Sequence, residues 1–133
     1  MKRQVSIAAL KKRCWKLLSE YVRRRAAGPD GWARCYTCGN ERHWKLMDAG
    51  HFVPGRTGSV LLNEEVLRVQ CKECNLWRGG NYHAYTLRMI DEVGREKVEE
   101  LLALKHKVRK WTREELMGFL DCYRERLRGL DRC

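Results

Sequence analysis

Two Cys-x-x-Cys pairs constrain this chain more than any other feature of its sequence. They are Cys35-Tyr36-Thr37-Cys38 and Cys71-Lys72-Glu73-Cys74, and 32 residues lie between them. Each pair can present two thiolates to one ion, and two pairs complete a closed tetrahedral site that contributes to folding. We predict a structural Zn²⁺ bound by Cys35, Cys38, Cys71 and Cys74. Iron or an iron–sulfur cluster stays open, because thiolates alone do not select the metal, and His43 could replace one cysteine.

The composition excludes several other classes of protein. The chain has 133 residues, of which 44% are hydrophobic, so it can form the core of one domain. It contains no run of about 18 apolar residues, and its basic N-terminus lacks the apolar stretch of a secretory signal. Seven cysteines are an odd number, which together with the two pairs favours reduced thiols over disulfides. We therefore expect a cytoplasmic protein with no membrane partner.

The positive charge is concentrated near the N-terminus. The net charge is +11, and residues 1–34 carry ten lysines and arginines against two acidic residues, a local charge of +8. Apolar residues recur at three- and four-residue steps over residues 7–25, which predicts a basic amphipathic helix. Such a helix suits a phosphate backbone, although a solvated basic face is the plain alternative. The residues that we expect to contact DNA are Lys11, Lys12, Lys16, Arg23, Arg24, Arg25, Arg56 and Arg78.

The sequence predicts three segments: residues 1–28 as the basic helix, 29–94 as the cysteine-containing core and 95–133 as C-terminal helices. The core should consist of short strands and turns, followed by a helix over residues 82–93. Thr112 and Glu115 have the spacing of a capping box that opens the last helix. Cys14 and Cys122 lie on or beside apolar stripes and are expected to be buried, whereas Cys133 is expected to be exposed.

The insertion between the two pairs carries polar residues of a chemically useful kind. His51 and Asn63 lie within it, and Asn75 directly follows Cys74. An imidazole can take a proton from water, and an amide can orient that imidazole through its carbonyl oxygen. A second amide can donate an oxygen ligand to a hard cation. These are parts that nuclease chemistry can use.

In the order of these motifs, the sequence resembles the HNH, or ββα-metal, endonucleases, and within them the phage NinG/Rap recombination endonucleases, which act on branched DNA. The resemblance implies an α+β fold, with a small zinc-stapled ββα-metal (treble-clef-like) HNH core flanked by N- and C-terminal helices. It also implies hydrolysis of phosphodiesters in Holliday junctions or D-loops with Mg²⁺ or Mn²⁺, in the host cytoplasm. The segments that carry it are Leu17–Arg23, Cys35–Gly39, Ala49–Phe52, Gln70–Asn75, Gly80–Tyr85 and Gly94–Val98.

Carried over by position, the resemblance makes His51 the general base, Asn63 the residue that orients it, and Asn75 a ligand of the catalytic ion. Many HNH enzymes have an aspartate ligand immediately before the base, but this chain has Gly50 there. The nearest carboxylate is Asp48, which a regular strand would direct away from His51. Asp48 could therefore be a ligand only if the strand bulges at Ala49-Gly50. His83 is a possible substitute ligand.

Two other functions remain open from the sequence. One is a non-catalytic zinc-stapled module that binds nucleic acid, and the other is a structural partner in a phage replication or recombination complex. Resolving a four-way junction requires two cuts, so the nuclease hypothesis also predicts a homodimer on branched or double-stranded DNA. The helix over residues 7–25 is the candidate for pairing subunits or embracing DNA arms.

Overall fold

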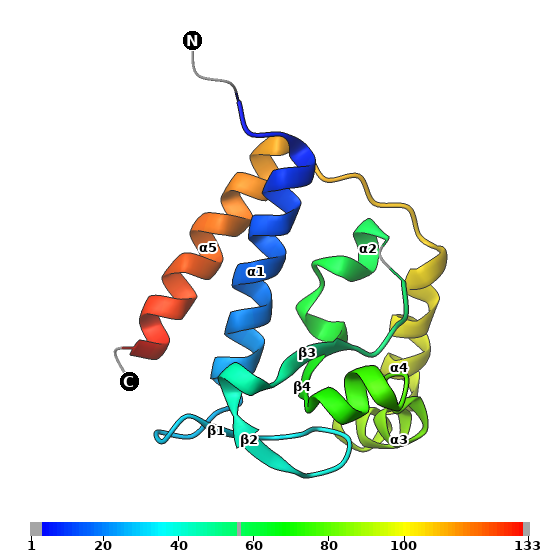
Figure 1. Cartoon of the computed structure of the whole chain (residues 1–133). Helices are drawn as coiled ribbons and strands as arrows, with labels where there is room; N and C mark the ends of the chain where they lie inside the picture. The colour runs from blue at the N-terminus through cyan, green and yellow to red at the C-terminus, as the bar shows by residue number, and fades with distance from the viewer. Residues whose placement is uncertain (1–3, 56, 132–133) are drawn as a thin grey trace.

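Short strands around the cysteine pairs are flanked by longer helices in a small mixed α+β fold (Figure 1). The structure is a computed structural model, and it describes residues 4–55 and 57–131. The helices are α1 Ile7–Arg25, α2 Gly58–Leu61, α3 Tyr82–Val93, α4 Arg95–Leu102 and α5 Arg113–Asp131. The strands are β1 Trp32–Arg34, β2 Glu41–His43, β3 Asp48–His51 and β4 Leu67–Gln70.

The strands form two antiparallel pairs that bring the cysteine motifs together. β1 pairs with β2, and the first cysteine pair lies in the connection between them. β3 pairs with β4 over four consecutive positions, from Asp48 opposite Gln70 to His51 opposite Leu67. The amide of Tyr36 donates to the carbonyl of Val69 at 2.9 Å, which joins the first pair of strands to the second. Because Cys71 directly follows β4, this contact places the two cysteine motifs side by side.

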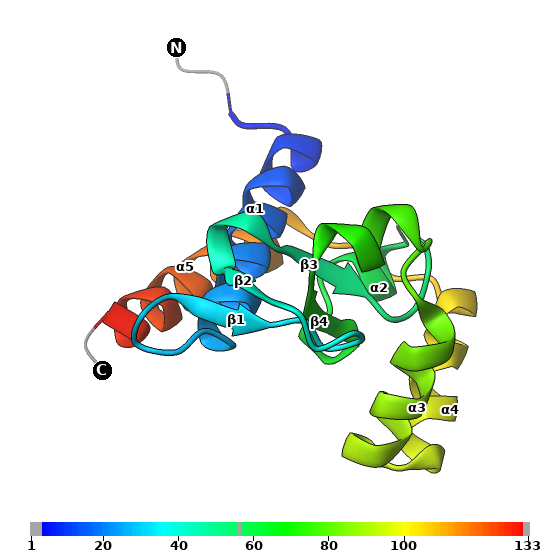
Figure 2. The ribbon, with the colours of Figure 1, turned by 60° about the horizontal axis from the view of Figure 1, so that its bottom comes forward.

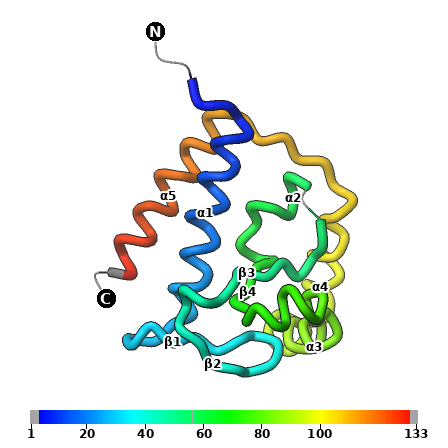
Figure 3. Tube along the Cα trace, viewed as in Figure 1, coloured from blue at the N-terminus to red at the C-terminus, as the bar shows by residue number. Residues whose placement is uncertain are grey.

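Helices α1 and α5 run parallel and pack along their length, as the two traces at the left of Figure 3 show. The Sγ of buried Cys14 donates to the carbonyl of Leu116 at 3.4 Å, and the rings of Tyr21 and Tyr123 meet at 5.4 Å. The buried residues of this core come from α1, α5, β3, β4 and the loop between the strands: Leu10, Cys14, Leu18, Val22, Ala49, Leu62, Leu67, Leu116, Leu120 and Tyr123. The apolar stripe of α1 is therefore covered by α5 within the chain, so pairing of subunits through α1 would have to use its exposed basic face.

A second core lies under α3 and α4, on the side of the strands away from α5 (Figure 2). Phe52 and Tyr85 are almost fully buried there, and their ring centroids are 5.1 Å apart. The Tyr85 hydroxyl donates to the carbonyl of Gly50 at 2.8 Å. Burial raises the pKa of the Tyr85 phenol, so it remains a hydrogen-bond donor. This bond fixes the residue that precedes His51 against α3.

The predicted helices over residues 7–25 and 82–93 are confirmed, and so is the capping box. The Thr112 amide donates to a Glu115 carboxylate oxygen at 3.1 Å, and the Glu115 amide donates to the Thr112 hydroxyl at 3.2 Å. Cys14 is buried as predicted, but the prediction for Cys122 is wrong, because this residue is exposed. It lies one position before Tyr123, about 100° around the helix from the buried stripe. Cys133 lies outside the described residues.

Within residues 4–55 and 57–131, none of the helices combines the length and the apolar character that crossing a bilayer requires.

The contact between α1 and α5 should contribute strongly to stability. Leu116 is completely buried between these helices, whereas the adjacent Met117 is 54% exposed. We expect Leu116→Ala to lower the free energy of unfolding by about 2–5 kcal/mol, because it leaves a cavity in the core. Met117→Ala is the matched control and should change it by less than about 0.5 kcal/mol. Denaturant unfolding of both variants measures the difference, and equal values would show that α5 is not part of the core.

Candidate metal centre and active site

The four cysteines of the two pairs converge into one cluster. The Sγ atoms of Cys35, Cys38, Cys71 and Cys74 all lie within 4.8 Å of one another. The Sγ atoms of Cys38 and Cys71 are 3.6 Å apart. Among the described residues, this is the one group of three or more histidine, cysteine or acidic side chains placed to hold an ion. The cluster could bind a metal such as zinc, since four thiolates at tetrahedral spacing are one of the usual ligand sets of that ion.

The surroundings of Cys35 favour the thiolate that a metal requires. Burial works against ionisation, but the hydrogen bond from the Thr37 hydroxyl and the bonds from nearby backbone groups outweigh it and lower the pKa of the Cys35 thiol to about 6. The Cys35 Sγ and Thr37 Oγ1 atoms are 3.4 Å apart. His43, considered above as a replacement ligand, instead accepts a hydrogen bond from the Lys45 amide at 3.2 Å. The donor set is therefore that of the cysteines alone.

His51 lies at the end of β3 and lines a surface hollow of about 310 Å³. Its imidazole stacks on the indole of Trp15 from α1, with ring centroids 4.9 Å apart and planes inclined by 18°. Its Nε2 atom is 3.2 Å from the carbonyl oxygen of Leu61. A proton on Nε2 would be donated to this carbonyl and would leave the lone pair on Nδ1. The ring is thus held between Trp15 of α1 and Leu61, the last residue of α2.

Asn75 lines the same hollow from the helical segment Glu73–Trp77, which begins within the second cysteine pair. Its Nδ2 atom donates to Asp48 Oδ2 at 3.1 Å, and Lys72 Nζ donates to Asp48 Oδ1 at 2.8 Å. The bulge at Ala49-Gly50 is absent, because β3 pairs with β4 at consecutive positions. Asp48 does not line the hollow. The structure therefore places Asp48 behind Asn75, where it orients the amide.

Asn63 stabilises the loop that faces His51. Its Oδ1 atom accepts from the Glu65 amide at 3.0 Å, and its Nδ2 atom donates to the Ser59 carbonyl at 3.4 Å. These two bonds hold the turn that follows α2, whose last residue, Leu61, places its carbonyl against the imidazole. The Asn63 oxygen that was expected to orient His51 is thus bonded to the Glu65 amide, and Asn63 acts on the imidazole through this turn.

The position before His51 has no room for the aspartate that many HNH enzymes have there. A Cβ atom on Gly50 would lie 1.8 Å from Gln70 Oε1, and Gln70 is completely buried. The Gln70 Nε2 atom donates to the Gly80 carbonyl at 2.9 Å and to the Thr37 hydroxyl at 3.1 Å. Gln70 therefore connects the first cysteine pair to the turn beside the hollow, and it takes the space that a side chain at position 50 would need.

The basic residues divide into those that face solvent and those with partners in the protein. Lys12 and Lys16 are exposed, and helical periodicity places them along one stripe beside Trp15. Lys11 is half-buried on the same helix, and Arg78 is exposed after the second cysteine pair. Arg56 lies outside the described residues. His83 is exposed in the first turn of α3.

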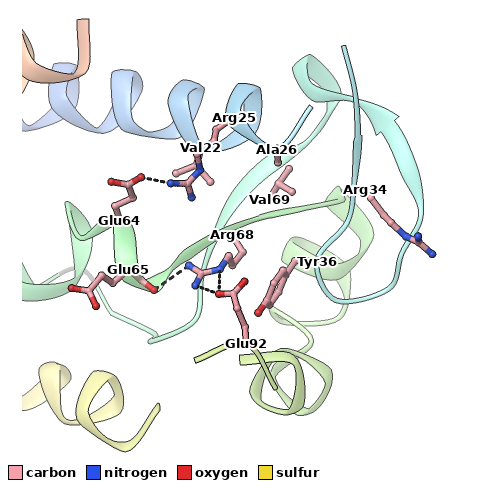
Figure 4. Close-up of a pocket in the computed structure, with 10 residues that line it drawn as sticks. All are labelled: Val22, Arg25, Ala26, Arg34, Tyr36, Glu64, Glu65, Arg68, Val69 and Glu92. Atoms are coloured by element: carbon pink, nitrogen blue, oxygen red, sulfur yellow. Dashed lines mark hydrogen bonds and ion pairs between the residues drawn. The ribbon is translucent and has the colours of Figure 1, made fainter. Parts of the chain in front are cut away.

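The three arginines at the end of α1 make specific contacts within the chain. Arg23 donates to the Ser19 carbonyl at 3.1 Å and lies over the Trp44 ring, while Arg24 pairs with Glu20 at 3.4 Å. Arg25 pairs with Glu64 across the charged pocket of Figure 4. In the same pocket Arg68 pairs with Glu92 of α3. Arg25 and Arg68 thereby stabilise the junction of helices and strands, while Lys12, Arg13 and Lys16 are exposed cations nearer the start of α1.

Four contributions to the site were not found from the sequence. They are the stacking ring of Trp15, the carbonyl of Leu61, the buried amide of Gln70 and the hydroxyl of Tyr85. The position of Trp15, beside the apolar stripe of the predicted basic helix, was a sequence signal for the stacking ring. The other three depend on contacts between segments distant in sequence, and no local pattern reports them.

The geometry defines a class of protein: a mixed α+β chain with a four-cysteine cluster beside a hollow lined by histidine and asparagine. A family model described as "Bacteriophage Lambda NinG protein" matches residues 2–132. The chain belongs to the NinG family of bacteriophage proteins. No solved structure matches it with significance.

Protein ninG of Escherichia phage lambda is similar to this chain. It is 30% identical over 99 residues, which cover 72% of this chain and 47% of the lambda protein. Protein ninG of Salmonella phage P22 is 29% identical with the same coverage of each chain. The chain thus spans about half the length of the curated relatives it matches.

Loss of the ion from the cysteine cluster should destabilise the protein. We expect about one zinc per chain by elemental analysis, and Cys71→Ser should lose the metal and lower the melting temperature, since binding such an ion contributes to folding. Cys122→Ser is the matched control, because this exposed cysteine lies outside the cluster. A Cys71→Ser protein that keeps both metal and melting temperature would contradict the assignment.

Proposed function

We propose that this protein is a metal-dependent DNA endonuclease of phage recombination that hydrolyses phosphodiesters in branched DNA. The observation that carries the proposal is that His51 and Asn75 line one hollow beside the cysteine cluster. The strand pair β3–β4 followed by the helical segment Glu73–Trp77 supports it, since this order agrees with the HNH resemblance. The motifs around His51 and Asn75 add to that support.

His51 acts as the general base in this proposal. Its Nε2 atom lies 3.2 Å from the Leu61 carbonyl oxygen, and the imidazole takes the proton from the attacking water. Trp15 holds the plane of the ring, and Asn63 holds the turn that follows Leu61. A base fixed from two sides loses little freedom when it reaches the transition state, and this lowers the entropic part of the barrier.

The hollow offers a hard cation one side-chain ligand of the expected kind, the amide oxygen of Asn75. Asp48 lies behind this amide and does not line the hollow. Mg²⁺ commonly keeps several water ligands and takes others from substrate phosphates, so a weak site of this kind fits Mg²⁺ or Mn²⁺. When bound, such an ion stabilises negative charge on the phosphate and the departing oxygen. Asp48 orients Asn75 for this role.

The cysteine cluster has a structural role in the proposal, with Zn²⁺ as its metal. It lies at the base of the segment that carries Asn75, because the backbone amide of Asn75 donates to the backbone carbonyl of Cys71 at 3.0 Å. A closed set of four thiolates leaves no open position for water or substrate, so this metal has no catalytic part. It holds Asn75 at the edge of the hollow.

DNA reaches the hollow along α1 in this proposal. Trp15 contacts His51, and Lys12 and Lys16 lie beside Trp15 on the same helix. Lysines in this position contact phosphates without reading the sequence, and this suits an enzyme that recognises the shape of its substrate. Two cuts across a junction call for two copies of the site, so we further propose that the protein acts as a homodimer.

Removing the base should abolish most cleavage. We expect His51→Ala to lower the rate on a four-way junction with Mg²⁺ or Mn²⁺ by ~10²–10⁴-fold, since this is the usual contribution of general-base catalysis. His106→Ala is the matched control, because His106 is an exposed histidine outside the hollow. Melting temperature and zinc content should be unchanged in both variants. Cleavage by His51→Ala at the parental rate would leave a non-catalytic zinc-stapled binding module as the function.

The lysines of α1 should account for much of the salt dependence of DNA binding. If about six phosphates are neutralised, log K should fall with log salt at a slope of about −5. Lys12→Gln with Lys16→Gln should reduce the slope by about 2, at about 0.9 for each lost phosphate contact. Lys105→Gln with Lys110→Gln removes the same charge from another exposed surface and is the control. An equal change of the slope in both double variants would show that DNA does not bind along α1.

A further inference from the structure

The segment that carries Asn75 also exposes two large apolar side chains. Trp77 is 84% exposed and Leu76 is 62% exposed. Both belong to the helical segment Glu73–Trp77, the green coil between β4 and α3 in Figure 2. Exposing two adjacent apolar side chains of this size to water is unfavourable in free energy, and such exposure is typical of an interaction site.

The contacts of Trp77 differ from those of two other tryptophans of the chain. Trp15 stacks on His51, and the Trp111 ring lies 3.9 Å from the guanidinium of Arg109. In the described part of the chain, Trp77 has neither a stacked ring nor a cation over its face. Both faces of its indole can therefore accept a planar partner.

The backbone around Trp77 is firmly held. The Arg78 amide donates to the Glu73 carbonyl, and the Gly80 amide donates to the Cys74 carbonyl, both at 2.8 Å. The exposed ring is thus attached to a rigid base beside the cysteine cluster. A partner that stacks on it would restrict few additional torsions, which favours binding.

Trp77 follows the hollow-lining residue Asn75 by two positions and lies beside a positive charge. Their Cα atoms are at most about 8 Å apart, but side chains two positions apart on a helical segment face different sides, and Trp77 does not line the hollow. Arg78 follows it directly and is exposed. An aromatic ring with a neighbouring cation fits a nucleic acid base and its phosphate, and this charge complementarity selects DNA over an apolar protein surface.

We propose that Trp77 stacks on an unstacked base at the branch point of a DNA substrate, with Arg78 at an adjacent phosphate. This inference rests on the proposed function and names the feature of the substrate that this site recognises. In a continuous duplex each base is already stacked on its neighbours, so an indole would first have to displace one of them. At a branch point that cost is lower, and Trp77 therefore favours branched over linear DNA.

The test measures binding without added Mg²⁺ or Mn²⁺, so that no strand is cut. The probes are a four-way junction with 2-aminopurine at the branch point and a linear duplex of matched sequence. We expect Trp77→Ala to weaken junction binding about tenfold or more, as is usual for loss of one base–aromatic stack, and to leave duplex binding unchanged. The parental protein should quench the 2-aminopurine fluorescence and Trp77→Ala should not, while Trp77→Phe should retain most of both effects.

Trp32→Ala is the matched control, because Trp32 is 51% exposed and belongs to β1. An equal loss with this variant, an equal loss on the duplex, or no loss with Trp77→Ala would overturn the inference. If Trp77→Ala had a different mass in sedimentation from the parental protein but the same DNA affinity, this would overturn the inference in favour of self-association through Leu76 and Trp77. Absence of any DNA binding by the parental protein would overturn it as well.

Cleavage with added Mg²⁺ or Mn²⁺ is assayed separately and distinguishes the two proposals. Junction binding that depends on Trp77 without any cleavage supports this inference and contradicts the nuclease function. Cleavage that depends on His51 together with unchanged binding by Trp77→Ala supports the nuclease function and overturns this inference.

Discussion

The convergence of four thiols is the constraint on which the rest of this structure depends. The first cysteine pair joins β1 to β2, and the second follows β4, so a shared cluster fixes one pair of strands against the other. Strands of three or four residues have few ladder bonds and cannot be stable alone. A metal bound there would add stabilising free energy that these short strands lack, and it would also hold the segment from which Asn75 reaches the hollow.

Helix α1 connects stability to the candidate chemistry. One of its faces packs against α5 through Cys14 and neighbouring leucines, while Trp15 stacks on His51. Lys12 and Lys16 remain on the exposed side of the same helix. Successive residues of a helix are rotated by about 100°, so α1 presents different residues to α5, to His51 and to solvent. A change in its packing on α5 would therefore also move the Trp15 ring that supports the imidazole.

The sequence predicted the elements with strong local signals. The helix from Ile7 to Arg25 follows from its apolar period, and the last helix follows from the capping box at Thr112. The burial of Cys122 was predicted wrongly, because a position one residue from the apolar stripe cannot be assigned until the partner helix is known. For the same reason the sequence could not show what covers the apolar stripe of α1, which is α5 of the same chain.

The sequence by itself identified four cysteines as candidate metal ligands, the candidate base and the concentration of charge in the first helix. Residue type and spacing are enough for these predictions, and neither depends on distant contacts. Only the tertiary structure decided that Asp48 stands behind Asn75, that Gln70 fills the space beside Gly50, and that a Leu61 carbonyl meets the imidazole. Each of these contacts joins residues ten or more positions apart in the sequence. Local periodicity does not distinguish between the many possible partners of each residue, and tertiary packing selects one of them.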